Sequence, residues 1–289
     1  MTTLYSSVIK LTSQHNVTLN HWGGQHAHAA FLGLIHAMDA ELAEQLHDAN
    51  ARKPFTVSPI LGLPQRQQPG RKQPESEMAG LYLREGWQCW LRVTMLDDVL
   101  FRAFLDRFLG SGSLPTIRIG DANFLVSEIL TTPGSHPWAG YVDLEELQKR
   151  LDEPAPAKFT FQLHTPTAFG WKDNLVATMP TPALVFGSLA RAWDAIQQNS
   201  EQAFLGQRQA KVIESYAAEN LLFSTFDLRT ERITLHNKTQ LGAVGRFEFI
   251  RNQKEDGRLA RALHLLADLA FYTGLGRKTT QGMGMTSRI

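Results

Sequence analysis

The order of strand-like and helix-like segments along the chain limits the folds that it can adopt. Residues 4–11 have the β-branched and apolar content of a strand. Apolar residues then recur at three- and four-residue intervals over residues 30–46, which predicts one helix or two short helices ending near His47. The next expected elements are a loop and strand at 53–61, two strands within 81–95, a helix at 99–109 capped by Asp97, and strands at 116–120 and 122–130.

The same order starts again after a Pro- and Gly-containing stretch at residues 131–140. The expected elements are a strand at 158–163, helices at 183–197 and 203–218, strands at 221–234 and 240–250, a helix at 258–272 and a last strand within 282–289. Strand, helix, strand, strand, helix, strand is the order of the ferredoxin-like (RRM-like) fold. We therefore predict an α+β protein of two tandem ferredoxin-like domains, residues 1–132 and 133–289, with a C-terminal glycine-rich loop.

Composition agrees with a folded protein and removes several function classes. The chain has 289 residues, of which 43% are hydrophobic and 20% charged, so each half can form an apolar core. No apolar stretch is long enough to span a bilayer, and the start lacks the pattern of a signal peptide, so we expect a cytoplasmic protein without a membrane partner. The single cysteine, Cys89, excludes an intramolecular disulfide and a thiolate metal site.

The distribution of charge is more informative than its sum. The net charge of +1 neither favours nor opposes a nucleic-acid partner. Residues 49–74 carry five basic residues and no acidic one, and residues 251–289 carry seven basic against three acidic ones. Each run alone is typical of a solvated face. Because both lie in loops that contain Gly or Pro, together they favour a polyanionic partner.

The glycine-rich loop at residues 274–284 is the most specific motif. Two Gly-x-Gly pairs enclose five polar residues that include Arg277 and Lys278. The loop follows a helix and precedes a strand, whereas dinucleotide-binding and Walker A loops lead from a strand into a helix, so neither of those motifs fits. Its backbone N–H groups and two cations could bind phosphates. The alternative is a glycine-rich helix C-cap that continues into a hairpin.

Two distant segments resemble one known family, the CRISPR-associated repeat-RNA endoribonucleases of the RAMP superfamily. GLGRKTTQGMGM is similar to the family's C-terminal pattern of Gly-x-Gly, five residues, Gly-x-Gly. LAEQLHDANARKPFTVSPI, at residues 42–60, is similar to its helix-ending Leu-His, short loop and Lys-Pro-Phe-x-x-Ser strand. PWAGYVDLEEL is a weaker match. The resemblance implies tandem ferredoxin-like domains, in agreement with the element order.

The resemblance also implies a reaction. Members of this family cleave RNA without a metal, by attack of a ribose 2′-hydroxyl on the adjacent phosphate, which leaves a 2′,3′-cyclic phosphate and a 5′-hydroxyl. Such a reaction needs a base, an acid and positive charge at the phosphate, roles that suit histidine and lysine. His47 and Lys53 stand in the two family motifs, and His36 lies where the family has Tyr or His. These three are the expected catalytic residues.

The expected partner is CRISPR repeat RNA (pre-crRNA), bound by a monomer or homodimer, with other CRISPR-associated proteins as further candidate partners. No cofactor and no metal are expected. The predicted RNA-binding residues are Arg52, Arg66, Arg71, Lys72, Gly274, Gly276, Arg277, Lys278, Gln281, Gly282 and Gly284.

Several alternatives remain open at this level. Which histidine is base and which is acid is undecided, a helix break near Asp39 would alter their geometry, and His26 and His28 are reserve catalytic candidates. The three histidines His21, His26 and His28 could suggest a zinc site, but no cysteine or carboxylate-rich segment accompanies them. A non-catalytic RAMP subunit that binds repeat RNA is the alternative function. A small-molecule enzyme is a third, and would need a closed apolar pocket.

Overall fold

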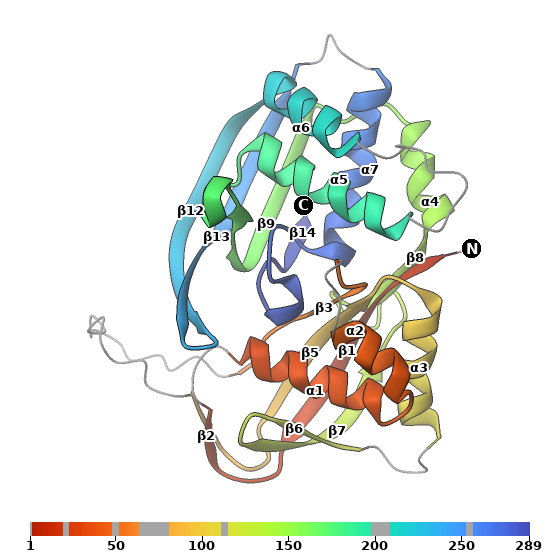
Figure 1. The fold of residues 1–289 in the computed structure, drawn as a ribbon, viewed down its shortest axis with the longest axis vertical. Coiled ribbons are helices and arrows are strands. Elements are labelled where there is room, and N and C mark those ends of the chain that lie inside the picture. The colour runs from red at the N-terminus through yellow and green to blue at the C-terminus, as the bar shows by residue number, and fades with distance from the viewer. Residues whose placement is uncertain are drawn as a thin grey trace.

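Two antiparallel sheets with packed helices make up the protein, one in each half of the chain (Figure 1). The computed structural model describes residues 2–19, 23–47, 52–63, 81–110, 115–197, 209–252 and 257–289. None of the helices in these ranges is long and apolar enough to cross a membrane.

The first sheet has the strand order β3-β5-β1-β7-β6. Without the added strand β6, this is the 2-3-1-4 order of a ferredoxin-like domain. The elements are β1 (Thr3–Ser13), α1 (Gly24–His36), α2 (Ala40–His47), β3 (Phe55–Val57), β5 (Gln88–Met95), α3 (Asp98–Leu109), β6 (Thr116–Ile119) and β7 (Ala122–Leu130). β2 (Val17–Leu19) and β4 (Leu81–Leu83) form a separate two-stranded ladder.

The second sheet has the order β12-β13-β9-β14, again 2-3-1-4. Its elements are β9 (Lys158–Thr167), α5 (Pro182–Ile196), α6 (Gln209–Asn220), β12 (Leu221–Leu235), β13 (Lys238–Arg251), α7 (Arg258–Thr273) and β14 (Thr286–Arg288). Shorter elements are α4 (Leu144–Gln148), η1 (Lys149–Leu151), β10 (Phe169–Gly170), η2 (Lys172–Asn174), β11 (Val176–Ala177) and η3 (Thr279–Gln281). The predicted pair of ferredoxin-like folds is therefore confirmed.

Local details follow from individual residues. The Asp97 carboxylate accepts a hydrogen bond from the Leu100 N–H at 2.7 Å, so it caps α3 as predicted. The helical pattern before His47 belongs to two helices, because α1 ends at His36 and α2 begins at Ala40. Of the two strands expected within residues 81–95, only β5 joins the sheet, since β4 pairs with β2.

The strand β8 (Gly140–Asp143) extends the first sheet beyond the predicted boundary between residues 132 and 133. β8 pairs with the start of β1, at Thr3 to Ser6, and β7 pairs with the rest, from Val8 to Ser13. One edge of β1 is therefore shared by two successive strands. The limits 1–132 and 133–289 stay a prediction.

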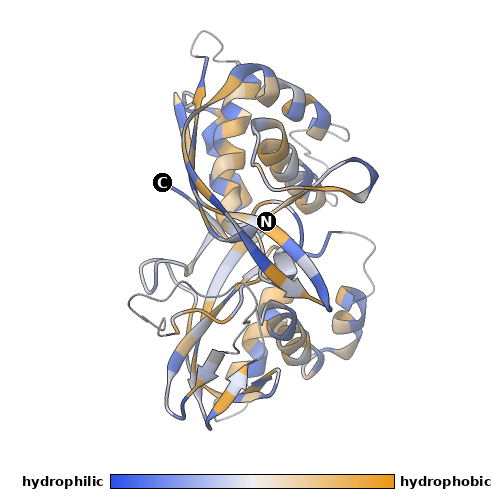
Figure 2. Cartoon of the chain, turned by 90° about the vertical axis from the view of Figure 1, so that its left-hand side faces the viewer, coloured by the Kyte–Doolittle hydropathy of each residue, from blue (hydrophilic) through white to orange (hydrophobic). Residues whose placement is uncertain are grey.

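Each sheet packs against its helices through an apolar core. The core of the second domain is rich in phenylalanine, with the rings of Phe161 and Phe247 stacked at 5.3 Å between centroids and Phe159 and Phe186 edge to face at 5.4 Å. Figure 2 shows hydrophobic residues alternating with hydrophilic ones along the strands and helices of both domains. This alternation is what a half-buried strand and an amphipathic helix require.

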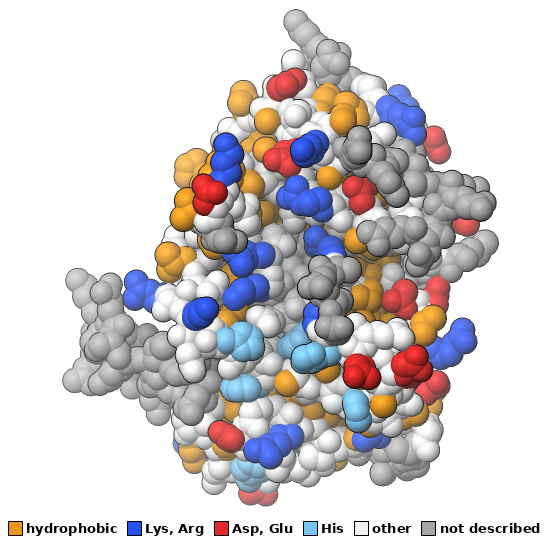
Figure 3. Space-filling view, in the orientation of Figure 1, with side chains coloured by type: hydrophobic (Ala, Val, Ile, Leu, Met, Phe, Trp, Pro, Cys, Tyr) orange, Lys and Arg blue, Asp and Glu red, His pale blue; other side chains and the backbone are white. Residues whose placement is uncertain are grey.

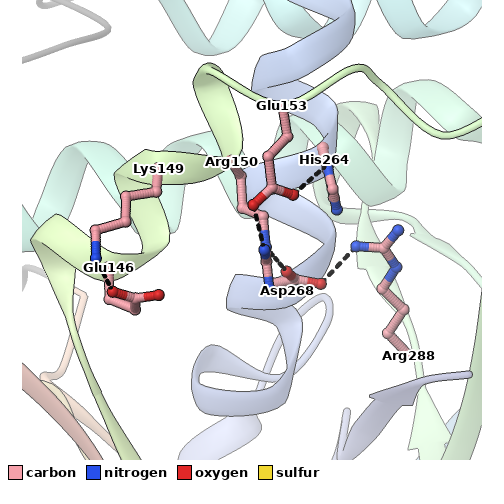
Figure 4. Close-up of polar contacts among 7 residues, drawn as sticks. All are labelled: Glu146, Lys149, Arg150, Glu153, His264, Asp268 and Arg288. Atoms are coloured by element: carbon pink, nitrogen blue, oxygen red, sulfur yellow. Dashed lines mark hydrogen bonds and ion pairs between the residues drawn. The ribbon is translucent and has the colours of Figure 1, made fainter.

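A carboxylate on α7 ties the end of the chain to the second domain (Figure 4). Asp268 accepts from Arg150 at 2.7 Å and from Arg288 of β14 at 2.5 Å, and Arg150 also bonds Glu153 at 2.7 Å. Asp268 is mostly buried, so these pairs are less screened by water than surface ion pairs. The network holds η1 and the last strand against α7.

A buried arginine joins the two domains. Arg92 of β5 is 3% exposed; its Nε donates to Ser6 Oγ at 2.8 Å and its Nη2 donates to the carbonyl of Phe271 on α7. Its guanidinium lies 4.5 Å from the Trp138 ring and 4.3 Å from the Phe271 ring, which stack on each other. Burial lowers the pKa of Arg92 to about 9. The rings and hydrogen bonds offset this desolvation.

Replacing Arg92 by methionine should lower the free energy of unfolding by about 2–4 kcal/mol, because the Phe271 carbonyl and Ser6 lose their buried partner and two rings lose a cation. The measurement is urea unfolding of both proteins. Arg102→Met, on the exposed face of α3, is the control and should change stability by less than about 0.5 kcal/mol. Equal effects of the two substitutions would contradict this role of Arg92.

Candidate active site

The glycine-rich loop is held in place by contacts of its backbone with neighbouring segments. Gly276 and Gly284 have φ angles of +80° and +76°, and a Cβ on either would lie 2.2 Å from a carbonyl oxygen, of Ala168 and Leu275 respectively. Only glycine fits both positions. The N–H groups of Gly274, Gly276 and Gly284 donate to Ala270 O, Ser188 Oγ and Pro166 O. These three glycines therefore shape the loop, and the binding of RNA by their N–H groups stays a prediction.

The shaped loop reaches the first domain. Its short helix η3 contacts α1 and β3, and Met283 packs with Ile233 and Leu235 of the β12–β13 hairpin. Gly282, with a φ of +93°, ends η3. The loop thus brings the C-terminal motif beside the helix that carries the predicted histidines.

His28 on α1 is the residue that the loop engages. Its Nδ1 donates to the carbonyl oxygen of Thr280 at 3.0 Å, and its ring stacks on Phe55 at 5.6 Å. Because a carbonyl can only accept, Nδ1 carries the proton and Nε2 is left as an acceptor. Burial, and then the charge of Lys53, lowers the pKa of His28 to about 4. At neutral pH the ring is therefore a neutral base of defined tautomer.

Lys53 and His47 lie next to His28. Lys53 Nζ donates to the backbone carbonyl of His47, the last residue of α2, at 3.3 Å. Burial lowers the pKa of Lys53. His47 also lowers the pKa of His28, to a smaller extent than Lys53 does. The two residues of the N-terminal motif and the reserve candidate His28 therefore form one cluster.

The tip of the β12–β13 hairpin completes this cluster from the second domain. His236 and Asn237 have φ angles of +49° and +60° and form the turn. The His236 N–H donates to Gln25 Oε1 at 2.7 Å, and the Gln281 amide donates to His236 Nε2 at 3.1 Å. In the sequence this segment is only the connection between the strands expected at 221–234 and 240–250. No spacing rule could have found His236, because 211 residues separate it from Gln25.

The other predicted histidines lie in two hollows beside α1. His36 and His47 line one of them, together with Ala40 and Glu44, although the helix is broken between them. His26 lines another, with Arg107 and Arg118. His21 lies outside the described residues. His36 thus shares a surface with His47, whereas His26 does not join the cluster.

Some of the predicted basic residues lie beside the cluster, and others lie outside the described residues. Arg52 and Arg277 line a hollow on the second-domain side of the cluster, and Lys278 lies close enough to Arg277 and Lys238 for their charges to lower its pKa, after burial. Figure 3 shows Lys and Arg side chains gathered in the middle of this face, with histidines beside them. Arg66, Arg71 and Lys72 lie outside the described residues.

The cluster can supply a base, an acid and positive charge without a metal. Among the described residues, no group of three or more His, Cys, Asp or Glu side chains is placed to hold a metal ion. The charges near His28 are cationic, which suits an anionic ligand such as a phosphate.

Comparison with known proteins connects this geometry to one family. Residues 3–149 match the family model of the CRISPR Cas6 N-terminal domain, and residues 161–286 match that of the CRISPR-associated endoribonuclease Cas6. The chain is similar to a Cas6 product complex, with 28% identity over 99% of each chain and a TM-score of 0.76. Thermus thermophilus Cas6 is 26% identical over 100% of this chain and 99% of its own, with a TM-score of 0.72. No curated protein sequence matches.

Stability should depend on pH through His28. Its pKa is about 4 in the folded protein and 6.5 in the reference state, so the unfolded chain binds the proton first as the pH falls. The free energy of unfolding should therefore decrease from about pH 6.5 to about pH 4. His28→Asn keeps an N–H for the Thr280 carbonyl but does not titrate, and should show a smaller decrease in urea unfolding over this range. An unchanged slope would contradict the environment described for His28.

Proposed function

The chain belongs to the CRISPR-associated endoribonuclease Cas6 family, and from this premise we propose that it cuts CRISPR repeat RNA (pre-crRNA) into guide RNAs by a metal-independent transesterification. In this reaction the ribose O2′ forms a bond to the adjacent phosphorus and the bond from phosphorus to O5′ breaks. The products are a 2′,3′-cyclic phosphate and a 5′-hydroxyl.

The observation that supports this proposal most is the position of His28 between the glycine-rich loop and Lys53. The loop carbonyl of Thr280 holds the proton on Nδ1, which leaves Nε2 free to take the proton of the 2′-hydroxyl. The lowered pKa keeps the ring neutral at physiological pH. We therefore assign His28 as the general base, a role for which the sequence offered it only as an alternative.

The remaining roles follow from charge. Lys53, which is hydrogen-bonded to the end of α2, can stabilise the negative charge on the phosphate. His47 can protonate the leaving O5′, and His36, across the shared hollow, is the second candidate for this acid. Base, acid and charge all come from side chains, so the proposed reaction requires no metal ion.

Binding of the repeat is proposed to depend mainly on phosphates. Arg277 and Lys278 lie together in the loop that touches His28, and Lys238 adds a charge from the neighbouring hairpin. Cations on one face release counterions from RNA when they bind its backbone, and affinity then falls as salt rises. The protein would recognise the repeat through its shape and unpaired bases.

Cleavage of repeat RNA in EDTA tests the assignment of roles. Wild-type protein should cut, and His28→Asn, His47→Ala and Lys53→Ala should each cut about 10²–10⁴ times more slowly, because each removes one catalytic group. His36→Ala should retain more activity than His47→Ala. Single-turnover rates with labelled RNA are the measurement.

A repeat with 2′-deoxyribose at the cut site is the control substrate and should be bound but not cut. Cleavage of this substrate would contradict 2′-hydroxyl attack, and full activity of His28→Asn would remove His28 from the reaction. Tight binding by wild-type protein without any cleavage would favour a non-catalytic repeat-RNA-binding RAMP subunit instead.

The loop cations can be tested separately by binding. Arg277→Ala with Lys278→Ala should weaken affinity for the uncleavable repeat. The fall of log affinity with log salt should also become less steep, by about 1–2 in the slope, in proportion to the number of phosphates that the two side chains neutralise. Arg102→Ala, on exposed α3, should leave the slope unchanged. The same slope in the double variant and the wild type would exclude this loop as a phosphate-binding element.

A further inference from the structure

The hollow that Arg52 and Arg277 line lies beside the histidine cluster, on the side of the second domain. Its volume is about 570 Å³. Arg52, which precedes β3, lines it together with Arg277 of the glycine-rich loop and Arg191 of α5. The wall also includes β10 and the turn that follows it, with Trp171, and residues of α5 and α6. We call this site the arginine hollow.

The charge of the arginine hollow is largely uncompensated. Arg191 pairs at 3.2 Å with Glu214, the one carboxylate among the described residues that line the hollow. In the part of the chain that the structure describes, Arg52 and Arg277 have no carboxylate partner, and Arg52 makes one long bond, of 3.5 Å, to the Ser188 carbonyl. Burial, and then the charge of Arg191, lowers the pKa of Arg52 to about 10. A desolvated guanidinium with other cations beside it is stabilised by an anion that lies between them.

An exposed aromatic ring stands at the edge of the same hollow. Trp171 is 54% exposed, although tryptophan is a highly buried residue on average. Its backbone is fixed, because the Trp171 N–H donates to the Leu175 carbonyl at 2.8 Å and η2 closes the turn between them. An exposed indole on an anchored turn is a surface on which a nucleobase can stack.

The arginine hollow and the proposed catalytic cluster are linked by two short pieces of chain. Arg52 lines the hollow, and the next residue, Lys53, lowers the pKa of His28. Arg277 lines the hollow, and three residues later Thr280 bonds His28. Consecutive Cα atoms are about 3.8 Å apart, so the two sites are separated by roughly the length of one or two nucleotides.

We propose that the arginine hollow binds one unpaired nucleotide of the RNA that adjoins the reacting phosphate, with its phosphate between Arg52, Arg191 and Arg277 and its base stacked on Trp171. This inference rests on the proposed function. The site would hold the RNA strand next to the cut while the histidine cluster acts on the reacting phosphate. An inorganic anion would need only the arginines, and the exposed indole is the feature that selects a nucleotide.

The test is a binding cycle between the protein and abasic RNA. Uncleavable repeats, each lacking one base within about three nucleotides of the cut, are bound to wild-type, Trp171→Ala and Trp171→Phe proteins. For wild type, one abasic position should weaken binding about tenfold, the effect of removing one stacked base. Trp171→Ala should bind the intact repeat about tenfold more weakly than the wild type does. Removing the base at that position should then weaken its binding no further. Trp171→Phe retains a ring and should behave like the wild type.

Arg191→Gln should weaken all the repeats equally, because it removes a phosphate contact and not the stacking one. If Trp171→Ala and the abasic substitution weaken binding independently at every position, the proposed nucleotide site is excluded. Cleavage of the normal repeat by the wild-type protein would then still support the proposed function. If wild-type protein neither binds nor cuts the repeat, both proposals fail. Unchanged affinity of Trp171→Ala would also overturn the inference, and would leave Trp171 as a surface for a protein partner.

Discussion

Arg92 lies where the sheet of the first domain meets the last helix of the second, with its charge enclosed by Trp138, Phe271 and two hydrogen bonds. A buried cation is tolerated only where its surroundings replace water, so the relative position of β5 and α7 is narrowly specified. The glycine-rich loop continues directly from α7. The position of Arg92 therefore determines where that loop meets the histidines of α1.

Close backbone contacts fix the path of this loop after α7. Its glycines allow backbone to approach backbone at Ala168 and Leu275, where any side chain would clash. The result is a carbonyl group, that of Thr280, held at His28 from a segment 252 residues away in sequence. In this structure the motif thus presents one carbonyl group to His28 and carries two cations, Arg277 and Lys278, beside it.

The candidate functional surface is consequently assembled from both domains. His28, His47 and Lys53 come from the first domain, whereas Arg277, Lys278 and His236 come from the second. Lys, Arg and His side chains gather on one face (Figure 3). Cations close to a neutral histidine keep it neutral and also favour the phosphate that it would act on. The proposed catalytic cluster and the arginine hollow both depend on this arrangement, since each uses groups from both sides of the junction.

The sequence alone was sufficient for the strand and helix order, the Asp97 cap and the family, because periodicity, capping and the two motifs are local properties. It left the arrangement of the site open. His28 was a reserve candidate and His236 belongs to no motif, because their contacts join segments far apart in sequence. The break between His36 and Ala40 was also left open. Only the tertiary structure shows that burial, the charge of Lys53 and one carbonyl group lower the pKa of His28 and set its tautomer, because these groups are brought to it by the fold.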